Sequence, residues 1–262
     1  MRAVTVSVCI PARNEQDTIA AVVGSVRGVA IVDEILVIDD GSTDATAAEA
    51  TAAGARVVAE ADVLPGTGPG AGKGNALWKG LAACHGDIVC YLDADLRNFR
   101  GEYVERLCRP LLDEPATVLV KAAYTRSFQG APTGGGRVTE LVARPLLDLL
   151  FPKLADITQP LGGEYAARRD ALETLPFVQG WGVEFAMLVD VVERYGRDAI
   201  AQVDLGMREH RNRPLDELAP QARAILATAL QRAGLLVDPA EVRERPPLVT
   251  VPAYRARSEP PR

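Results

Sequence analysis

Two aspartates separated by one small residue follow a short apolar segment in the first half of the chain. The apolar run at 89–92 predicts a buried strand, and Asp93-Ala94-Asp95 comes directly after it. Carboxylates that converge at a strand end repel each other unless a cation neutralises them. A hard divalent cation with oxygen ligands does so and can also hold a diphosphate. The pair alone fits such a site, or a helix-capping aspartate beside a solvated one.

Two other polar segments follow predicted strands in the same way. Residues 11–15 (Pro-Ala-Arg-Asn-Glu) follow a strand predicted over 4–10, and residues 39–44 (Asp-Asp-Gly-Ser-Thr-Asp) follow one predicted over 33–38. Open α/β sheets bind ligands at the carboxyl ends of their strands. Glu15 and Asp40 can therefore accept hydrogen bonds from a base or ribose. Each segment alone also fits an ordinary loop, turn or helix cap.

Residues 65–74 form the most glycine-rich stretch of the chain and end in Gly72-Lys73-Gly74. A phosphate-binding P-loop requires glycine five residues before the Gly-Lys pair and Ser or Thr after it, and both positions differ here. A dinucleotide fingerprint fits only loosely, because no strand leads into it and Pro69 interrupts it. We predict a flexible loop that places Lys73 at the start of a helix, where it suits a diphosphate. The alternative is a mobile loop with an incidental lysine.

The second half of the chain carries further candidate residues. Three glycines precede Arg137 and Thr139, which suit a phosphate or carboxylate, although a linker with a helix cap fits too. Glu184 opens a predicted helix and can bind a sugar hydroxyl or act as a surface charge. His210 lies in a basic run at a strand end. A single histidine is more often structural, but Asp95 needs a second metal ligand.

Strands alternate with helices along the chain, which predicts an α/β fold with a mostly parallel central sheet flanked by helices. Strands are predicted at 4–10, 33–38, 55–59, 87–92, 117–123 and 199–205, and helices at 17–26, 75–83, 103–112, 138–150 and 218–233, with another that ends near 53. We predict one domain over 1–237, with a nucleotide-sugar half to about 125 and an acceptor half after it. The Pro- and Arg-rich residues 238–262 predict an extended tail.

Composition narrows the class of protein. The 262 residues carry a net charge of −6, which argues against a general nucleic-acid binder. The four cysteines show no paired spacing, so we expect buried free thiols in a reducing compartment. No apolar run is long enough for a membrane span or a signal peptide. We therefore expect a cytoplasmic protein.

An acidic pair at a strand tip, a lysine in a glycine loop and a later histidine together indicate a sugar-nucleotide-dependent glycosyltransferase. The sequence also resembles the glucosyl-3-phosphoglycerate synthase family, retaining glycosyltransferases of the GT-A fold, over roughly residues 4–236. The most specific matches are Gly134-Gly135-Gly136-Arg137-Val138-Thr139-Glu140-Leu141 and the basic run Arg208-Glu209-His210-Arg211-Asn212-Arg213-Pro214. Residues 11–15, 72–78, 142–146, 159–165 and 199–203 match as well. The matches at 40–44 and 93–95 are weak, because these elements occur across many glycosyltransferases.

The resemblance implies a UDP-glucose donor, a 3-phosphoglycerate acceptor, Mg²⁺ or Mn²⁺ and a homodimer. It implies a metal held by Asp95 and His210, and it assigns catalysis to Asp95, Glu184 and Lys73. The nucleotide-sugar set that it implies is Pro11, Ala12, Glu15, Asp40, Lys73, Asp93 and Ala94. The acceptor set that it implies is Gly136, Arg137, Thr139, Arg208, Arg211 and Asn212.

Three departures from the family pattern fall at the implied donor pocket. Asp40 and Ala94 stand where relatives often have serine, and Trp181 stands where they have tyrosine. GDP-mannose, the donor of the related mannosyl-3-phosphoglycerate synthases, therefore stays open as an alternative. A non-catalytic sugar-nucleotide sensor is a further one. A polyprenyl-phosphate glycosyltransferase usually needs membrane attachment, and a nucleotidyltransferase would carry its glycine loop after the first strand.

Overall fold

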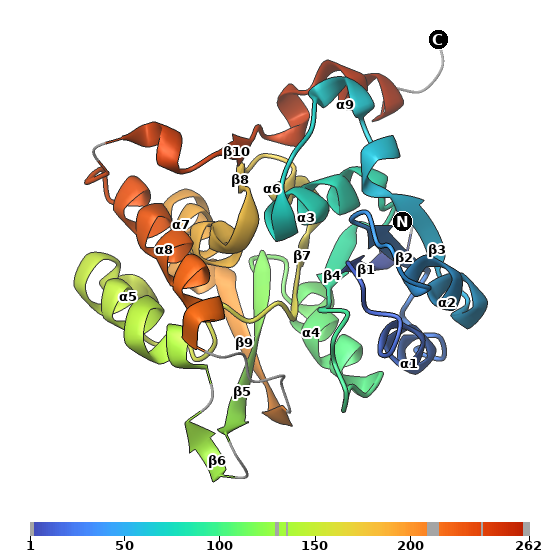
Figure 1. The fold of residues 1–262 in the computed structure, drawn as a ribbon, viewed down its shortest axis with the longest axis horizontal. Coiled ribbons are helices and arrows are strands. Elements are labelled where there is room, and N and C mark those ends of the chain that lie inside the picture. The colour runs from blue at the N-terminus through green and yellow to red at the C-terminus, as the bar shows by residue number, and fades with distance from the viewer. Residues whose placement is uncertain (1–2, 129–130, 135, 209–214, 237, 259–262) are drawn as a thin grey trace.

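An eight-stranded sheet forms the centre of the protein (Figure 1). The structure, a computed structural model, describes residues 3–128, 131–134, 136–208, 215–236 and 238–258. The strands follow the order β3-β2-β1-β4-β7-β5-β6, and β9 pairs with β5. Their bounds are β1 (Val6–Ala12), β2 (Glu34–Asp39), β3 (Arg56–Ala59), β4 (Ile88–Tyr91), β5 (Leu119–Phe128), β6 (Ala131–Gly134), β7 (Tyr165–Arg168) and β9 (Ile200–Arg208).

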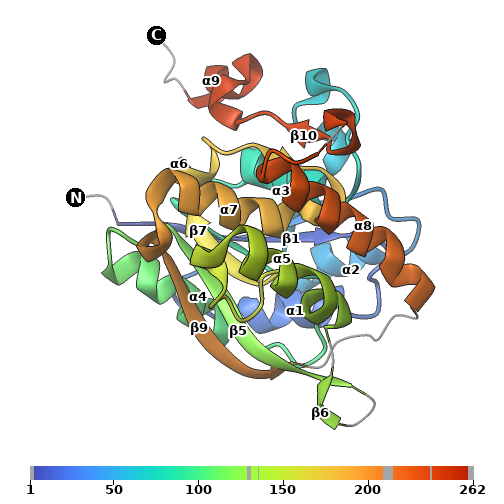
Figure 2. The ribbon, with the colours of Figure 1, turned by 90° about the vertical axis from the view of Figure 1, so that its left-hand side faces the viewer.

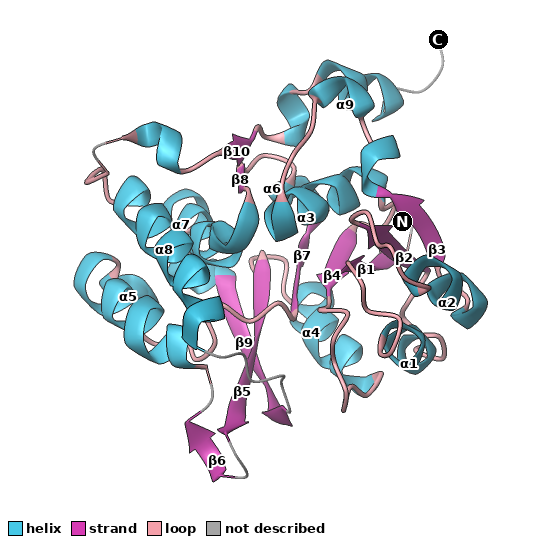
Figure 3. Ribbon diagram, in the orientation of Figure 1, coloured by secondary structure: helices cyan, strands magenta, loops and turns pink. Residues whose placement is uncertain are grey.

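Parallel pairing dominates the sheet and confirms the predicted α/β class. Strands β3, β2, β1 and β4 run parallel, as do β5 and β9. Strand β7 is antiparallel to both β4 and β5 and joins these two groups. Figure 3 shows helices on both sides of the central strands, whereas β6 and the lower ends of β5 and β9 extend beyond them. Parallel sheets need such cover, because both of their faces are apolar.

Helices cover both faces of the sheet, and the alternation of residues along β1 explains how. Val8 and Ile10 pack with α1 and α4 on one face, whereas Cys9 packs with α3 on the other (Figure 2). The helices are α1 (Ile19–Val26), α2 (Thr46–Ala53), α3 (Gly72–Ala83), α4 (Glu102–Asp113), α5 (Arg144–Leu150), α6 (Arg169–Leu172), α7 (Val183–Tyr195), α8 (Leu215–Arg232) and α9 (Pro252–Ser258). Shorter helical turns lie between them. Within the described residues, no helix has the length and apolarity to cross a membrane.

The cysteines and the helix predicted over 138–150 differ in how well the structure matches the prediction. All four cysteines are buried and free, as expected. The helix predicted over 138–150 is irregular, because residues Thr139–Ala143 form a π-helical turn before α5 begins. Such turns are rare and frequently mark functional sites.

The expectation of an extended tail after residue 237 is wrong for the described part of that segment. Strand β10 (Glu244–Arg245) pairs with β8 (Phe177–Val178), and α9 follows. Leu248, Val251 and Tyr254 are buried in the same core cluster as α3 and α7. These three apolar residues recur three apart, but the high Pro, Arg and Glu content around them is typical of a disordered tail, and the prediction followed that composition.

The glycine-rich loop is packed rather than flexible at three of its glycines. A Cβ at Gly70 would lie 1.9 Å from the Asn75 side-chain oxygen, and one at Gly74 would lie 1.9 Å from the Val178 carbonyl oxygen. Gly72 has a φ of +67° and approaches Gly180. Glycine is required here because neighbouring segments approach the backbone closely.

Replacing Gly74 with alanine should lower the free energy of unfolding by about 1–3 kcal/mol, because the new methyl group overlaps the β8 backbone. Urea unfolding followed by circular dichroism measures the change. Gly24 in α1 is a matched control, since a Cβ there meets nothing within 4 Å. Gly24→Ala should raise stability by about 0.5–1 kcal/mol. Equal effects at the two positions would contradict the close packing of Gly74.

Candidate functional site

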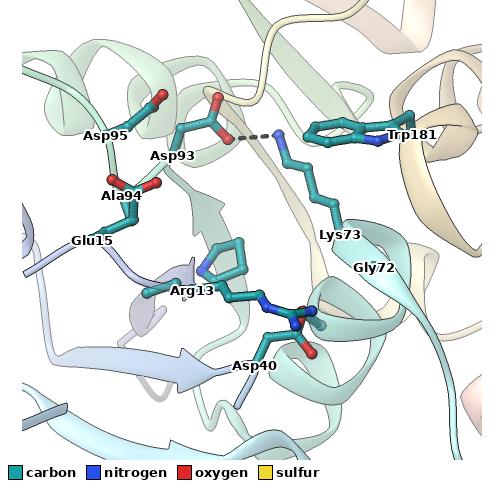
Figure 4. A pocket seen from close by; sticks show the side chains of 12 residues that line it. Arg13, Glu15, Asp40, Gly72, Lys73, Asp93, Ala94, Asp95 and Trp181 are labelled. Atoms are coloured by element: carbon teal, nitrogen blue, oxygen red, sulfur yellow. Dashed lines mark hydrogen bonds and ion pairs between the residues drawn. The ribbon is translucent and has the colours of Figure 1, made fainter. Parts of the chain in front are cut away.

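A cavity of about 340 Å³ opens at the carboxyl ends of β1, β2 and β4. This is the edge where open α/β sheets bind ligands. Figure 4 shows Lys73 and Trp181 on one side of the cavity and Glu15 and Asp95 on the other. The lining residues are Pro11, Ala12, Arg13, Glu15, Asp40, Gly72, Lys73, Ala76, Asp93, Ala94, Asp95 and Trp181. Every residue predicted for the nucleotide-sugar lies in this list.

The Lys73 ammonium connects two carboxylates at the inner end of the cavity. Its Nζ lies 2.6 Å from Asp93 Oδ1 and 2.7 Å from Glu184 Oε1. Burial by itself would lower the pKa of Lys73, but Asp93 and Glu184 outweigh burial and raise that pKa well above its usual value. Lys73 is therefore a permanent positive charge at this point.

Glu184 is a buried residue of the site. Only 3% of its side chain is exposed, although it opens α7. The alternative of a solvated surface charge at a helix end is therefore wrong. The short helical turn Gly180–Gly182 brings the chain across the glycine loop just before α7, and so directs Glu184 towards Lys73.

Asp93 and Asp95 follow β4 without forming a helix, so the capping alternative does not apply. A Cβ at residue 163 would lie 2.1 Å from Asp93 Oδ1, so Gly163 leaves the space that the carboxylate occupies. Burial and the neighbouring Asp93 charge raise the pKa of Asp95. A positive charge beside Asp95 would reverse this effect.

The charges that line the cavity suit a divalent cation. Four carboxylates line it, with two basic side chains, Arg13 and Lys73. Full ionisation leaves two negative charges uncompensated, and carboxylate oxygens are the ligands that Mg²⁺ and Mn²⁺ prefer. Within the described residues no three His, Cys, Asp or Glu side chains form a metal-binding group. His210, the second predicted ligand, lies outside the described residues.

Two of the predicted ligand-binding loops are bonded to each other. The Asn14 amide donates to Ser42 Oγ at 3.0 Å, and the Thr43 amide donates to Asn14 Oδ1 at 2.8 Å. The Glu15 amide donates to Thr46 Oγ1 at 2.8 Å. Residues 11–15 and 40–46 thus form one wall of the cavity.

Asp40 is half-buried at the end of this wall. Its Oδ2 lies 3.9 Å from Arg13 Nη1. Burial raises the pKa of Asp40, and Arg13 offsets part of that rise. Arg13 lies within a motif that the sequence singled out, but it was not predicted as a site residue.

Trp181 lines the cavity; the family resemblance placed it at the donor pocket, but it was not among the predicted binding residues. Its side chain is 39% exposed and forms the rim of the cavity beside Lys73 (Figure 4). A tryptophan between two glycines at the start of a helix is the signal that could have identified it, because exposed aromatic side chains often contact ligands.

The predicted acceptor residues that the structure describes, Gly136, Arg137, Thr139 and Arg208, are not among the residues that line this cavity. Gly136, with a φ of +73°, and Arg137 precede the π-helical turn, and Thr139 is buried within it. Among the described residues that line the cavity, none comes from this segment. Arg208 ends β9. Arg211 and Asn212 lie outside the described residues.

The end of β9 lies close to the aspartate pair. Asn98, three residues after Asp95, donates from Nδ2 to the Met207 carbonyl at 3.2 Å. The chain therefore enters residues 209–214 from a point beside the loop that carries Asp95.

Comparisons with known proteins identify the family to which this chain belongs. Residues 7–175 match the sequence family described as "Glycosyl transferase family 2". A glucosyl-3-phosphoglycerate synthase of Mycolicibacterium paratuberculosis is 51% identical over 240 residues, which are 88% of this chain and 73% of that protein. One of Petrotoga mobilis is 41% identical over 289 residues, covering 97% of this chain and 89% of that protein.

Solved structures extend the likeness to the fold. The Mycobacterium tuberculosis glucosyl-3-phosphoglycerate synthase, crystallised with Mn²⁺, UDP-glucose and phosphoglyceric acid, superposes with a TM-score of 0.86 at 46% identity. The match covers 94% of this chain and 91% of that one. The same enzyme has also been crystallised with Mg²⁺ and UDP. This chain therefore belongs to glycosyl transferase family 2 and, within it, to the glucosyl-3-phosphoglycerate synthases, and it is a glycosyltransferase.

Proposed function

We propose that this protein transfers glucose from UDP-glucose to 3-phosphoglycerate, with retention of configuration and with Mg²⁺ or Mn²⁺ bound. The observation that carries the proposal is the cluster of Lys73, Asp93 and Glu184 beside Asp95, at the carboxyl edge of a parallel sheet. The M. tuberculosis relative binds the same donor, acceptor and metal. We propose that the nucleotide lies along the wall formed by residues 11–15 and 40–46.

We propose a role for each side chain, supported by the charges of the described residues and by the family resemblance. Asp95 and His210 would hold the cation, which when bound neutralises the diphosphate leaving group. Lys73 donates to the diphosphate at the start of α3, where the helix terminus also favours an anion. Glu184 accepts a hydrogen bond from a glucose hydroxyl. Gly136, Arg137, Thr139, Arg208, Arg211 and Asn212 would hold the acceptor's phosphate and carboxylate.

We propose the following course for the transfer of glucose. The bond between the anomeric carbon of glucose and the diphosphate oxygen breaks as the glycerate hydroxyl approaches from the same face. The hydroxyl oxygen forms the new glycosidic bond, and its proton passes to the departing phosphate oxygen. Glu184 is engaged by Lys73 at 2.7 Å, which suits a carboxylate that orients the sugar rather than one that attacks it.

The direct test is product formation from 3-phosphoglycerate with Mg²⁺, with UDP-glucose and GDP-mannose assayed side by side. We expect UDP-glucose to dominate. Turnover with GDP-mannose at an equal or higher rate would make the chain a mannosyl or dual-specificity synthase, with Asp40, Ala94 and Trp181 as the candidate causes. Binding of either donor without turnover would indicate a sugar-nucleotide sensor. Failure of both donors to bind would overturn the proposal.

Asp95→Asn should lower turnover by at least about 10²-fold, because the neutral amide no longer attracts the cation. His210→Ala should have a similar effect. The measurement is the initial rate over a Mg²⁺ titration, before and after treatment with EDTA. Asp113→Asn, at the exposed end of α4, is the control and should change neither rate nor Mg²⁺ dependence. A fully active Asp95→Asn variant would remove Asp95 from the metal site.

Lys73→Met should lower kcat/KM for UDP-glucose by about 10²–10³-fold, the usual effect of losing a preorganised donor to a charged leaving group. Steady-state kinetics at saturating 3-phosphoglycerate measures this change. Lys153→Met provides the matched control, because Lys153 is an exposed lysine of the turn Pro152–Leu154. Equal kinetics for the two variants would exclude Lys73 from the diphosphate site.

The homodimer and the cytoplasmic location are also proposals. Leu141 and Leu149 are 73% and 80% exposed, on the π-helical turn and on α5. An exposed apolar surface of this kind suits contact with a second copy. Size-exclusion chromatography with light scattering measures the mass in solution.

A further inference from the structure

We propose that Arg245 is a positioning residue for the nucleotide-sugar, because it holds the glycine loop of residues 65–72 that places Lys73 in the cavity. The inference rests on the proposed function for the identity of the ligand. It deepens that function by giving the C-terminal segment a part in donor binding. The segment lies outside residues 7–175, the part that matches the family.

The Arg245 guanidinium binds three acceptors that surround the glycine loop. Nε donates to Asn75 Oδ1 at 2.6 Å, Nη1 donates to the Thr67 carbonyl at 2.8 Å and Nη2 donates to the Gly68 carbonyl at 2.9 Å. The residue is 5% exposed. A planar guanidinium can satisfy three acceptors spread in this way, whereas an ammonium cannot hold the same geometry.

The Arg245 guanidinium also packs against Trp78 of α3 and against the backbone of the glycine loop at Gly70. The guanidinium carbon lies 5.2 Å from the centre of the Trp78 ring in α3. A Cβ at Gly70 would lie 2.4 Å from Arg245 Nη2, so the loop backbone rests directly on the guanidinium. Both the loop and the first turns of α3 are thereby held by one side chain.

A second set of bonds connects the same loop to residues 179 and 180, directly before Trp181 on the same side of the cavity. The Ala71 amide donates to Gln179 Oε1 at 2.9 Å, and the Gly180 amide donates to the Ala71 carbonyl at 3.1 Å. The Gln179 amide donates to the Arg243 carbonyl at 2.8 Å, next to the pairing of β10 with β8.

These bonds also support Trp181 and Glu184, the two residues beside Lys73. Gln179 and Gly180 lead directly into Trp181 and then into Glu184 at the start of α7. The C-terminal segment therefore supports both Lys73, through the loop, and Glu184, through residues 179–182. Displacing either by a fraction of an ångström would weaken donor binding.

Three variants and two measurements test the proposal. Arg245→Met removes the donors and keeps most of the apolar stem, and Arg245→Lys keeps the charge alone. Gln179→Leu removes the acceptor of the Ala71 amide and leaves the two backbone bonds and the buried guanidinium in place. Arg255→Met is the matched control, because Arg255 is an exposed arginine of the same C-terminal segment. Calorimetry gives the dissociation constants of UDP with Mg²⁺ and of 3-phosphoglycerate, and hydrogen exchange reports on residues 65–73.

We expect Arg245→Met to raise the dissociation constant of UDP by about tenfold or more and to change that of 3-phosphoglycerate by less than about twofold. Amides of residues 65–73 should exchange faster. Arg245→Lys should restore little of the UDP affinity, and Gln179→Leu should shift it in the same direction. The Arg255→Met variant should match the unsubstituted protein in both measurements.

Several results would overturn the proposal. One is an unchanged dissociation constant for UDP in the Arg245→Met variant. Another is an equal loss of affinity for UDP and for 3-phosphoglycerate in that variant, because it would indicate a general structural role. If Arg245→Met does not fold, unchanged UDP affinity in Gln179→Leu decides against it. If the unsubstituted protein binds no UDP, the proposed function fails, whereas hydrogen exchange still reports whether Arg245 holds the loop.

Discussion

The ion-pair cluster centred on the Lys73 ammonium is the interaction on which the site depends. It joins the start of α3, the end of β4 and the start of α7, three elements far apart in the sequence. Buried carboxylates such as Glu184 are costly unless a charge compensates them, so each element stabilises the position of the others. The same arrangement leaves a fixed positive charge where a diphosphate would lie. Folding and ligand recognition thus depend on the same contacts.

The sequence predicted the parts of the site that follow a strand. Residues 11–15, 40–44 and 93–95 meet at one sheet edge, because parallel strands end there and the chain has no other way to connect them. Trp181 was placed at the donor pocket only through the family resemblance. The buried state of Glu184 escaped prediction, because it depends on how residues 177–184 cross the glycine loop. The acceptor side was predicted from the glycines before Arg137 and Thr139 and from the family resemblance, but Gly136, Arg137 and Thr139 do not line the described cavity.

The glycine-rich segment 65–74 was predicted to be flexible, and this prediction from composition failed. Residues 65–74 suggested flexibility, yet Gly70 and Gly74 are glycines because another segment occupies the space of a side chain. Arg245 contacts Gly70 and also binds Asn75, from which it is separated by 170 residues in the sequence. No local sequence pattern encodes a contact between residues so far apart. Composition alone therefore cannot distinguish a mobile glycine loop from a tightly packed one.

Strand β7 has a consequence for how this architecture can diversify. Its four residues are the only described connection in the sheet between the β3-β2-β1-β4 group and the strands β5, β6 and β9. Each group keeps its own pattern of pairing, so substitutions that accumulate beyond β7 need not disturb the register of β1 with β4. Recombination at this narrow junction would exchange one side of the sheet as a module. Trp181, Glu184 and Arg245 come after β7 in the chain, so such an exchange would leave the cavity intact only if the new segment retained these three residues.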